Sequence, residues 1–337
     1  MKSFDGYKRG VNLGGWLSQC VEYTDSHFDN FITDDDIAKI KEWGMDHVRL
    51  PIDCDVIAND DCSFNSKGIV HVDDCIRWCE AEGLNVILDL HKTFGYTFDT
   101  DVVADPGVFF KDKTLQGKFV ELWKTLATRY GNDPHVAFEL LNEVTDPVFE
   151  DSWNSIATEA IKSIRQISPQ SDIIIGGVNN NGVMNVRGIN IPLDEHIVYT
   201  FHFYEPIAFT HQNACWIKGI SDEGAIGYPA PLSRYREIVK KYLPIQAEIL
   251  MQDCVKSEES LFEDLFADAV SVAEEAGVPL YCGEYGVIDR AEIDDAIRWA
   301  ERICNAFEKY NIGHAMWNYK EKDFGLSGKR EALVKYI

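Results

Sequence analysis

Short apolar segments alternate with longer amphipathic segments along almost the whole chain, and this alternation constrains the fold more than any other feature. Eight runs rich in apolar and β-branched residues stand at 9–15, 47–52, 85–91, 136–143, 172–178, 197–204, 279–286 and 314–320. Many are almost continuously hydrophobic, as expected for strands buried on both faces of a parallel sheet. Amphipathic helices are predicted between them at 34–43, 73–82, 115–130, 153–167 and 260–276. Strands that alternate with helices in this way predict an α/β fold, the (β/α)8 or TIM barrel.

The chain of 337 residues fits one such barrel with enlarged loops, so we predict a single domain over residues 1–337. One segment breaks the alternation. Residues 205 to about 257, after the sixth predicted strand, contain Trp216, the prolines Pro229, Pro231 and Pro244, and a helical stretch from Ser233 onward. Connections of this length in compact domains are usually functional or form a small subdomain. We therefore predict a subdomain inserted at the carboxyl-terminal rim of the barrel, over any active site there.

Charge and cysteine content narrow the classes of function. The formal net charge is −24, from 32 basic and 56 acidic residues. Because such a surface repels phosphate backbones and anionic lipids, we expect neither nucleic acid nor membrane as a partner. The nine scattered cysteines form no Cys-x-x-Cys pair, and no His-Glu-x-x-His motif occurs, so no disulfide framework, metal or cofactor is expected.

The polar amino terminus predicts no signal peptide. We expect a cytoplasmic monomer, or a secreted protein if a leader has been removed.

Polar and aromatic residues stand where six of the apolar runs end. These endings are Arg49-Leu50-Pro51, Asp89-Leu90-His91, Leu141-Asn142-Glu143, His202-Phe203-Tyr204, Gly283-Glu284-Tyr285-Gly286 and Trp317-Asn318-Tyr319. In a (β/α)8 barrel the carboxyl-terminal ends of the strands meet at one rim, which carries the active site. The six endings therefore predict a single site.

Two of these residues are glutamates, Glu143 on the fourth predicted strand and Glu284 on the seventh. Hydrolysis of a glycosidic bond uses one carboxylic acid to protonate the leaving oxygen and one carboxylate to attack or assist at the sugar carbon. A separation of about 5–5.5 Å would mean retention of configuration. An isolated glutamate is most often a solvated charge, but the polar residues around these two favour a catalytic pair. Glu139 shares strand parity with Glu143, and we predict a buried structural charge that needs a partner.

The residues at these endings resemble, in the same order, the pattern of glycoside hydrolase family 5. The matching residues are Arg49, His91, Asn142, Glu143, His202, Tyr204, Glu284 and Trp317. The resemblance extends from the Asn12-Leu13-Gly14-Gly15-Trp16 motif to Lys320 and is closest to clostridial endoglucanases that lack a signal peptide. It implies a retaining endo-β-glucanase without a cofactor, acting on β-1,4 or mixed-linkage β-1,3-1,4-glucan as oligosaccharide or polysaccharide.

The resemblance also implies a role for each residue. Glu143 would be the acid/base and Glu284 the nucleophile. Arg49 would pair with Glu284 and keep it ionised, while Tyr204 would orient it by a hydrogen bond. His202 would support Glu143. The acid has to hold a proton at the working pH, and burial beside a negative partner would raise its pKa.

The remaining residues are implied to bind sugar. Asn142 would bond the 2-hydroxyl group, His91 would reach other hydroxyls, and Trp317 would form the floor on which the sugar stacks. Trp216 is our first choice for a further aromatic platform because it lies in the long rim segment. Weaker candidates for the same role are Trp16, Phe94, Tyr96, Phe209 and Tyr285.

Other readings remain open. The Asn12–Trp16 motif also resembles fungal exo-β-1,3-glucanases of the same family, and β-mannan is a further possible substrate. The loop after His91 departs from the usual family pattern, which leaves the preferences of the neighbouring sugar sites open. Transglycosylation would follow if a sugar intercepted the glycosyl-enzyme. A non-catalytic carbohydrate-binding barrel is the most distant alternative, since such a protein would be expected to have lost one of the glutamates.

Overall fold

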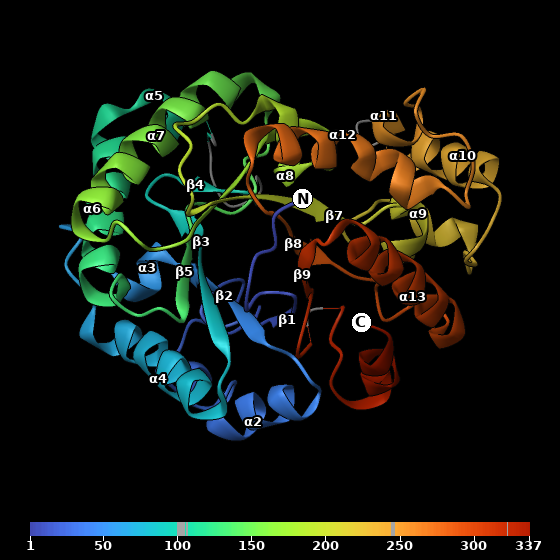
Figure 1. Cartoon of the computed structure of the whole chain (residues 1–337). Helices are drawn as coiled ribbons and strands as arrows, with labels where there is room; N and C mark the ends of the chain where they lie inside the picture. The colour runs from blue at the N-terminus through green and yellow to red at the C-terminus, as the bar shows by residue number, and fades with distance from the viewer. Residues whose placement is uncertain (100–104, 106, 244–246, 322) are drawn as a thin grey trace.

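The computed structural model describes residues 1–99, 105, 107–243, 247–321 and 323–337, and Figure 1 shows parallel strands surrounded by helices. In their order around the barrel the strands are β1 (Arg9–Asn12), β2 (His47–Asp53), β3 (Asn85–Thr93), β5 (Val136–Glu139), β6 (Ile173–Gly176), β7 (Ile197–Phe203), β8 (Leu280–Tyr285) and β9 (Gly313–Met316). The barrel closes because β1 pairs in parallel with both β2 and β9. A short strand, β4 (Tyr96–Thr97), pairs antiparallel with the end of β3. The predicted (β/α)8 barrel is confirmed.

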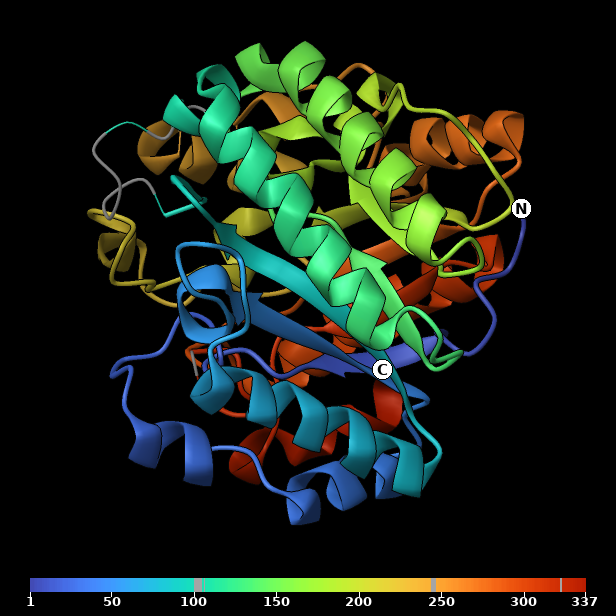
Figure 2. The same cartoon turned by 90° about the vertical axis from the view of Figure 1, so that its left-hand side faces the viewer.

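Helices that cover the barrel are α2 (Asp34–Glu42), α4 (Ser66–Glu82), α6 (Lys113–Tyr130), α7 (Glu150–Ile167), α12 (Leu261–Ala276) and α13 (Ile293–Tyr310). Figure 2 shows α4 and α6 running along the outside of the strands. Short helices in the loops are α1 (Asp25–Asn30), α3 (Cys54–Ile57), α5 (Val108–Lys111), α8 (Val178–Asn181), η1 (Pro147–Phe149), η2 (Val183–Gly188) and η4 (Gly328–Tyr336). Among the helices of the described residues, none is long and apolar enough to cross a membrane.

The start of α4 differs from the prediction. The sequence pattern indicated a helix from residue 73, whereas α4 begins at Ser66, where the Asn65 side chain accepts a hydrogen bond from the backbone N–H of Lys67. Gly68 has low helix propensity, which weakened the pattern in the first turns. In the structure Gly68 packs against α3, and a Cβ at this position would overlap the backbone carbonyl of Val56. Tertiary packing therefore requires the residue that disfavours the helix locally.

The interior of the barrel is apolar at its amino-terminal end. Phe4, Tyr7, Ile87, Ala137, Ile174, Val198, Tyr281 and Ala315 form one buried cluster there. Because side chains alternate along a strand, the residues two positions further on point into the same interior. Those residues are Asp89 after Ile87 and Glu139 after Ala137. A charged layer thus lies directly above the apolar one.

The segment predicted as a rim insertion contains four short helices between β7 and α12. These are α9 (Ile207–Thr210), η3 (Ile220–Glu223), α10 (Leu232–Tyr242) and α11 (Ala247–Leu250). Helix α10 contacts the other three and buries Tyr235 and Ile238, and Figure 1 shows α9, α10 and α11 gathered on one side of the barrel. Residues 244–246 of the predicted insertion lie outside the described residues.

The close packing at Gly68 gives a stability test. We expect Gly68→Ala to lower the free energy of unfolding by about 2–3 kcal/mol, because the added methyl group must displace backbone atoms of α3. Gly117→Ala in α6 is the matched control, since a Cβ there meets nothing within 4 Å. It should raise the free energy of unfolding by about 0.5–1 kcal/mol through helix propensity. Urea denaturation measures both, and equal effects of the two substitutions would contradict the assignment.

Candidate active site

One buried arginine organises the carboxyl-terminal end of the barrel interior. Arg49 of β2 is fully buried and binds both carboxylate oxygens of Glu139, with Nε 2.7 Å from Oε2 and Nη2 3.0 Å from Oε1. The same guanidinium lies 3.0 Å from the carboxylate of Asp89 and 2.8 Å from that of Glu284. Burial alone would lower the pKa of Arg49, but these carboxylates raise it above its ordinary value. Glu139 is the buried charge that the sequence predicted, and Arg49 is its partner.

The two glutamates predicted as a catalytic pair lie close together at this end of the barrel. His202 of β7 contacts both of them, with its Nδ1 2.8 Å from Oε1 of Glu143 and 3.7 Å from Oε2 of Glu284. The facing atoms of these three residues all lie within 4.8 Å of one another. The Glu284 carboxylate also accepts a hydrogen bond of 3.0 Å from the hydroxyl of Tyr204. The carboxyl-terminal ends of three strands, β5, β7 and β8, thus meet at one point.

The two glutamates have different electrostatic surroundings. Glu284 accepts hydrogen bonds from the guanidinium of Arg49 at 2.8 Å and from the hydroxyl of Tyr204 at 3.0 Å. Burial raises the pKa of Glu143, and a hydrogen bond of 2.9 Å from the amide of Asn180 offsets only part of this effect. The two carboxyl groups therefore differ in their partners: Glu284 faces a cation and a hydroxyl group, whereas Glu143 faces a histidine and an amide.

The histidines of the site are held in their neutral forms. Burial lowers the pKa of His202 to about 4 and also lowers the pKa of His91. The Nε2 atom of His91 lies 3.0 Å from the amide nitrogen of Gln19, which can only donate, so Nδ1 carries the proton. Nδ1 then donates to Asp89 at 2.6 Å. Burial raises the pKa of Asp89 to about 7, although the neighbouring Arg49 acts in the opposite direction.

Trp317 lies against His91, with ring centroids 5.9 Å apart and planes at 12°. The chain near β1 supports this arrangement, because a Cβ at Gly14 would overlap the Trp317 ring. Asn12 accepts a hydrogen bond of 2.9 Å from Nη1 of Arg49. The Asn12-Leu13-Gly14 motif therefore has a structural reason that is independent of which sugar is bound.

Sequence reasoning missed three residues at the site. Asn12 contacts Arg49, Gln19 orients His91, and Asn180 binds Glu143. Gln19 left no signal, since it lies in an irregular loop after β1. Two signals were available for the others: Asn12 is a polar residue within the first predicted strand, 9–15, and a run of asparagines at 179–181 directly follows the fifth. Asn142 accepts a hydrogen bond of 3.0 Å from Nη2 of Arg49.

Most of the weaker aromatic candidates are wrong. Trp16, Tyr96, Phe209 and Tyr285 are at most 1% exposed and have no face free for a sugar, whereas Trp317 is 6% exposed. Strand ends place aromatic residues both inside the barrel and under the helices, and the sequence does not separate the two. Trp216 is different, because its side chain is 54% exposed. Its ring lies 6.2 Å from that of His211, which lies 5.1 Å from Tyr204.

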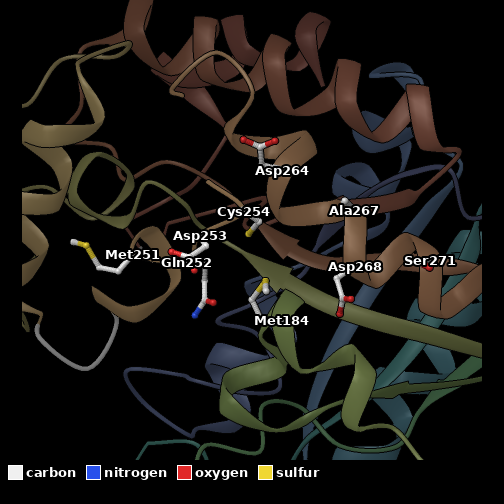
Figure 3. A pocket seen from close by; sticks show the side chains of 9 residues that line it. All are labelled: Met184, Met251, Gln252, Asp253, Cys254, Asp264, Ala267, Asp268 and Ser271. Carbon is white, nitrogen blue, oxygen red and sulfur yellow. The ribbon is translucent and has the colours of Figure 1, made fainter. Parts of the chain in front are cut away.

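A hollow of about 630 Å³ lies apart from these residues, between η2, α12 and the end of the insertion (Figure 3). Met184, Met251, Cys254, Asp264 and Asp268 are among the residues that line it. Neither glutamate of the pair is among them. We therefore locate the candidate active site at the converging carboxyl groups and not at this hollow.

A (β/α)8 barrel with two such carboxyl groups at its carboxyl-terminal end defines a class, the glycoside hydrolases. Comparison with known families agrees with this class, since the model described as cellulase (glycosyl hydrolase family 5) matches residues 5–323. The chain belongs to glycosyl hydrolase family 5.

Individual relatives cover nearly the whole chain. It is 40% identical over 309 residues to cellodextrinase A of Ruminococcus flavefaciens, covering 91% of this chain and 84% of that protein. It is 39% identical over 324 residues to endoglucanase C of Acetivibrio thermocellus, covering 94% and 92%. Among solved structures, the clostridial cellulose synthase subunit Z of Clostridioides difficile matches with a TM-score of 0.78 and 25% identity, covering 98% of this chain and 99% of that one.

The contacts of Arg49 give a test of the network. We expect Arg49→Lys to lower the free energy of unfolding by about 3 kcal/mol and kcat/KM by at least about a hundredfold, because an ammonium group cannot bind Glu139 bidentately and still reach Glu284. Arg187→Lys, at an exposed pair with Asp268, is the control and should change stability by less than about 1 kcal/mol. Thermal denaturation and steady-state kinetics measure both. Wild-type kinetics in Arg49→Lys would refute the role of the guanidinium.

Proposed function

We propose that the chain is a retaining endo-β-glucanase that cleaves β-1,4 linkages of cellulose-type or mixed-linkage β-1,3-1,4-glucan by double displacement. The observation that carries the proposal is the spacing of Glu143 and Glu284, whose facing oxygens lie within 4.8 Å. Retaining enzymes have carboxyl groups about 5–5.5 Å apart, whereas inverting enzymes leave about 6.5–9.5 Å for a water molecule. The names of the relatives, an endoglucanase and a cellodextrinase, support the substrate class.

The surroundings of the two glutamates support one order of events. In the first step Glu143 gives its proton to the glycosidic oxygen while a carboxylate oxygen of Glu284 forms a bond to the sugar carbon, and the leaving sugar departs as an alcohol. The negative charge of Glu284 is then gone. In the second step ionised Glu143 removes a proton from water, the water oxygen bonds to the sugar carbon, and the Glu284 carboxylate is released.

The substrate is proposed to lie over the neutral histidines and the tryptophan. Asn142 would bond the 2-hydroxyl group, His91 would bond neighbouring hydroxyls, and the sugar would stack on Trp317. Trp216 would bind a further sugar, because its exposed ring contacts that of His211, which in turn contacts that of Tyr204. A neutral glucan meets no repulsion from the acidic surface. We propose that the enzyme acts as a monomer without a cofactor.

The order of events predicts chemical rescue. We expect Glu284→Ala to lose more than about 10⁴-fold in kcat, since no nucleophile remains. Added azide should restore part of the turnover of an activated aryl glycoside, because the anion fits the space of the carboxylate and attacks directly. The product should be the glycosyl azide of inverted configuration, identified by NMR. Absence of rescue together with an inverted sugar product from the wild-type enzyme would exclude the double displacement.

The substrate proposal is tested by a panel of glycans. We expect a rapid fall in viscosity and internal cleavage products from barley β-glucan and carboxymethylcellulose, and little product from laminarin or mannan. Cello-oligosaccharides of increasing length separate the two named activities, because a cellodextrinase would prefer the short chains. Glucose released from the ends of laminarin would instead support an exo-β-1,3-glucanase, and rapid cleavage of mannan a β-mannanase.

A further inference from the structure

The segment between β6 and η2, which includes the short helix α8, has an unusual backbone conformation. Asn179, Asn180 and Asn181 follow one another with φ of 57°, 57° and 51°, in the left-handed region that few residues other than glycine and asparagine adopt readily. Gly176, at the end of β6, leaves room for the loop, since a Cβ there would overlap the side chain of Asn181. Gly182 then forms an isolated bridge with His202. This conformation turns the loop back toward the barrel.

The asparagine loop, residues 179–181, contacts Glu143 and the histidine beside it, His202. The Asn180 side chain is exposed, and its Nδ2 donates to Oε2 of Glu143 at 2.9 Å. Its backbone N–H donates to the carbonyl of Val144 at 3.0 Å, which ties the loop to the segment that carries the glutamate. The Asn181 amide lies 3.5 Å from Nε2 of His202.

Glu143 is therefore held through both of its oxygens. Oε1 faces Nδ1 of His202 at 2.8 Å, and Oε2 accepts from Asn180 at 2.9 Å. An N–H donor beside a carboxyl oxygen stabilises the ionised form over the protonated form. The neighbouring Asn179 has the same conformation and exposure, but its amide donates to Asn185 at 3.2 Å instead.

We propose that Asn180 is a positioning residue that orients Glu143 and favours its ionised form in the second displacement, in which Glu143 acts as a base. This inference rests on the proposed acid/base role of Glu143. The amide acts against burial, which favours the protonated form needed in the first displacement. One residue has to serve as acid and then as base at one pH, and Asn180 adjusts the balance between the two.

The test compares Asn180→Gly with Asn179→Gly. Glycine adopts positive φ without strain, so each substitution removes one amide and keeps the turn. In Asn180→Gly we expect the pKa of Glu143 to rise, which moves the alkaline limb of kcat/KM for an unactivated cello-oligosaccharide up by about one pH unit. On a dinitrophenyl cellobioside, hydrolysis of the glycosyl-enzyme limits kcat. That kcat should fall about tenfold at pH values below the pKa of Glu143 in the glycosyl-enzyme, because less Glu143 is then ionised. Asn179→Gly should change neither quantity.

A second variant keeps the test decisive if the glycine variants lose stability. Asn180→Asp keeps the size and the tolerance of positive φ but replaces the donor by a second carboxyl group, so it should move the limb at least as far in the same direction. The proposal would be overturned if neither Asn180 variant shifted the alkaline limb of kcat/KM. It would also be overturned if Asn180→Gly and Asn179→Gly lost equal kcat on the dinitrophenyl cellobioside.

Glu143→Gln separates this inference from the function on which it rests. If Glu143 is the acid/base, this substitution spares the first step on the activated substrate but slows it strongly on the unactivated one. Equal losses on both substrates would refute the acid/base assignment itself. If Glu143→Gln spares only the activated substrate, as expected, but the Asn180 variants leave the alkaline limb of kcat/KM unshifted, only the role of Asn180 is refuted.

Discussion

Arg49 brings one positive charge into a region that holds three carboxyl groups, those of Asp89, Glu139 and Glu284. Unpaired charges in such a place cost several kcal/mol each, and a guanidinium with its planar set of donors can bind more than one carboxylate. One charge does not neutralise three. Burial raises the pKa of Asp89 to about 7 although Arg49 acts in the opposite direction.

The barrel explains why this network lies where it does. Side chains that alternate along the strands place apolar residues such as Ile87 and Ala137 in one layer and acidic residues in the next. The apolar layer keeps water away from below, so each charge and hydrogen bond in the layer above acts more strongly than at the surface. The same burial raises the pKa of Glu143 and keeps His202 neutral.

Much of the fold and of the site was predictable because both depend on short-range pattern. Apolar runs of strand length that end in polar residues identified the strands, the catalytic rim and the residues implied as a catalytic pair. The start of α4 was not predictable, because Gly68 is required by a contact with α3 and not by its own helix. The weaker aromatic candidates were mostly wrong, since Trp16, which follows β1, and Tyr285, which ends β8, are both buried in the core.

By itself the sequence determined the kinds of residue at each strand end and, through the alternation of strands and helices, that these ends share one rim. Only the tertiary structure decided which of them touch. Glu143 and Glu284 are far apart in the chain, and the surroundings that distinguish them come from Arg49 in β2, His202 in β7 and Asn180 after β6. Burial raises the pKa of Glu143, and this burial arises only when separate strands close into a barrel.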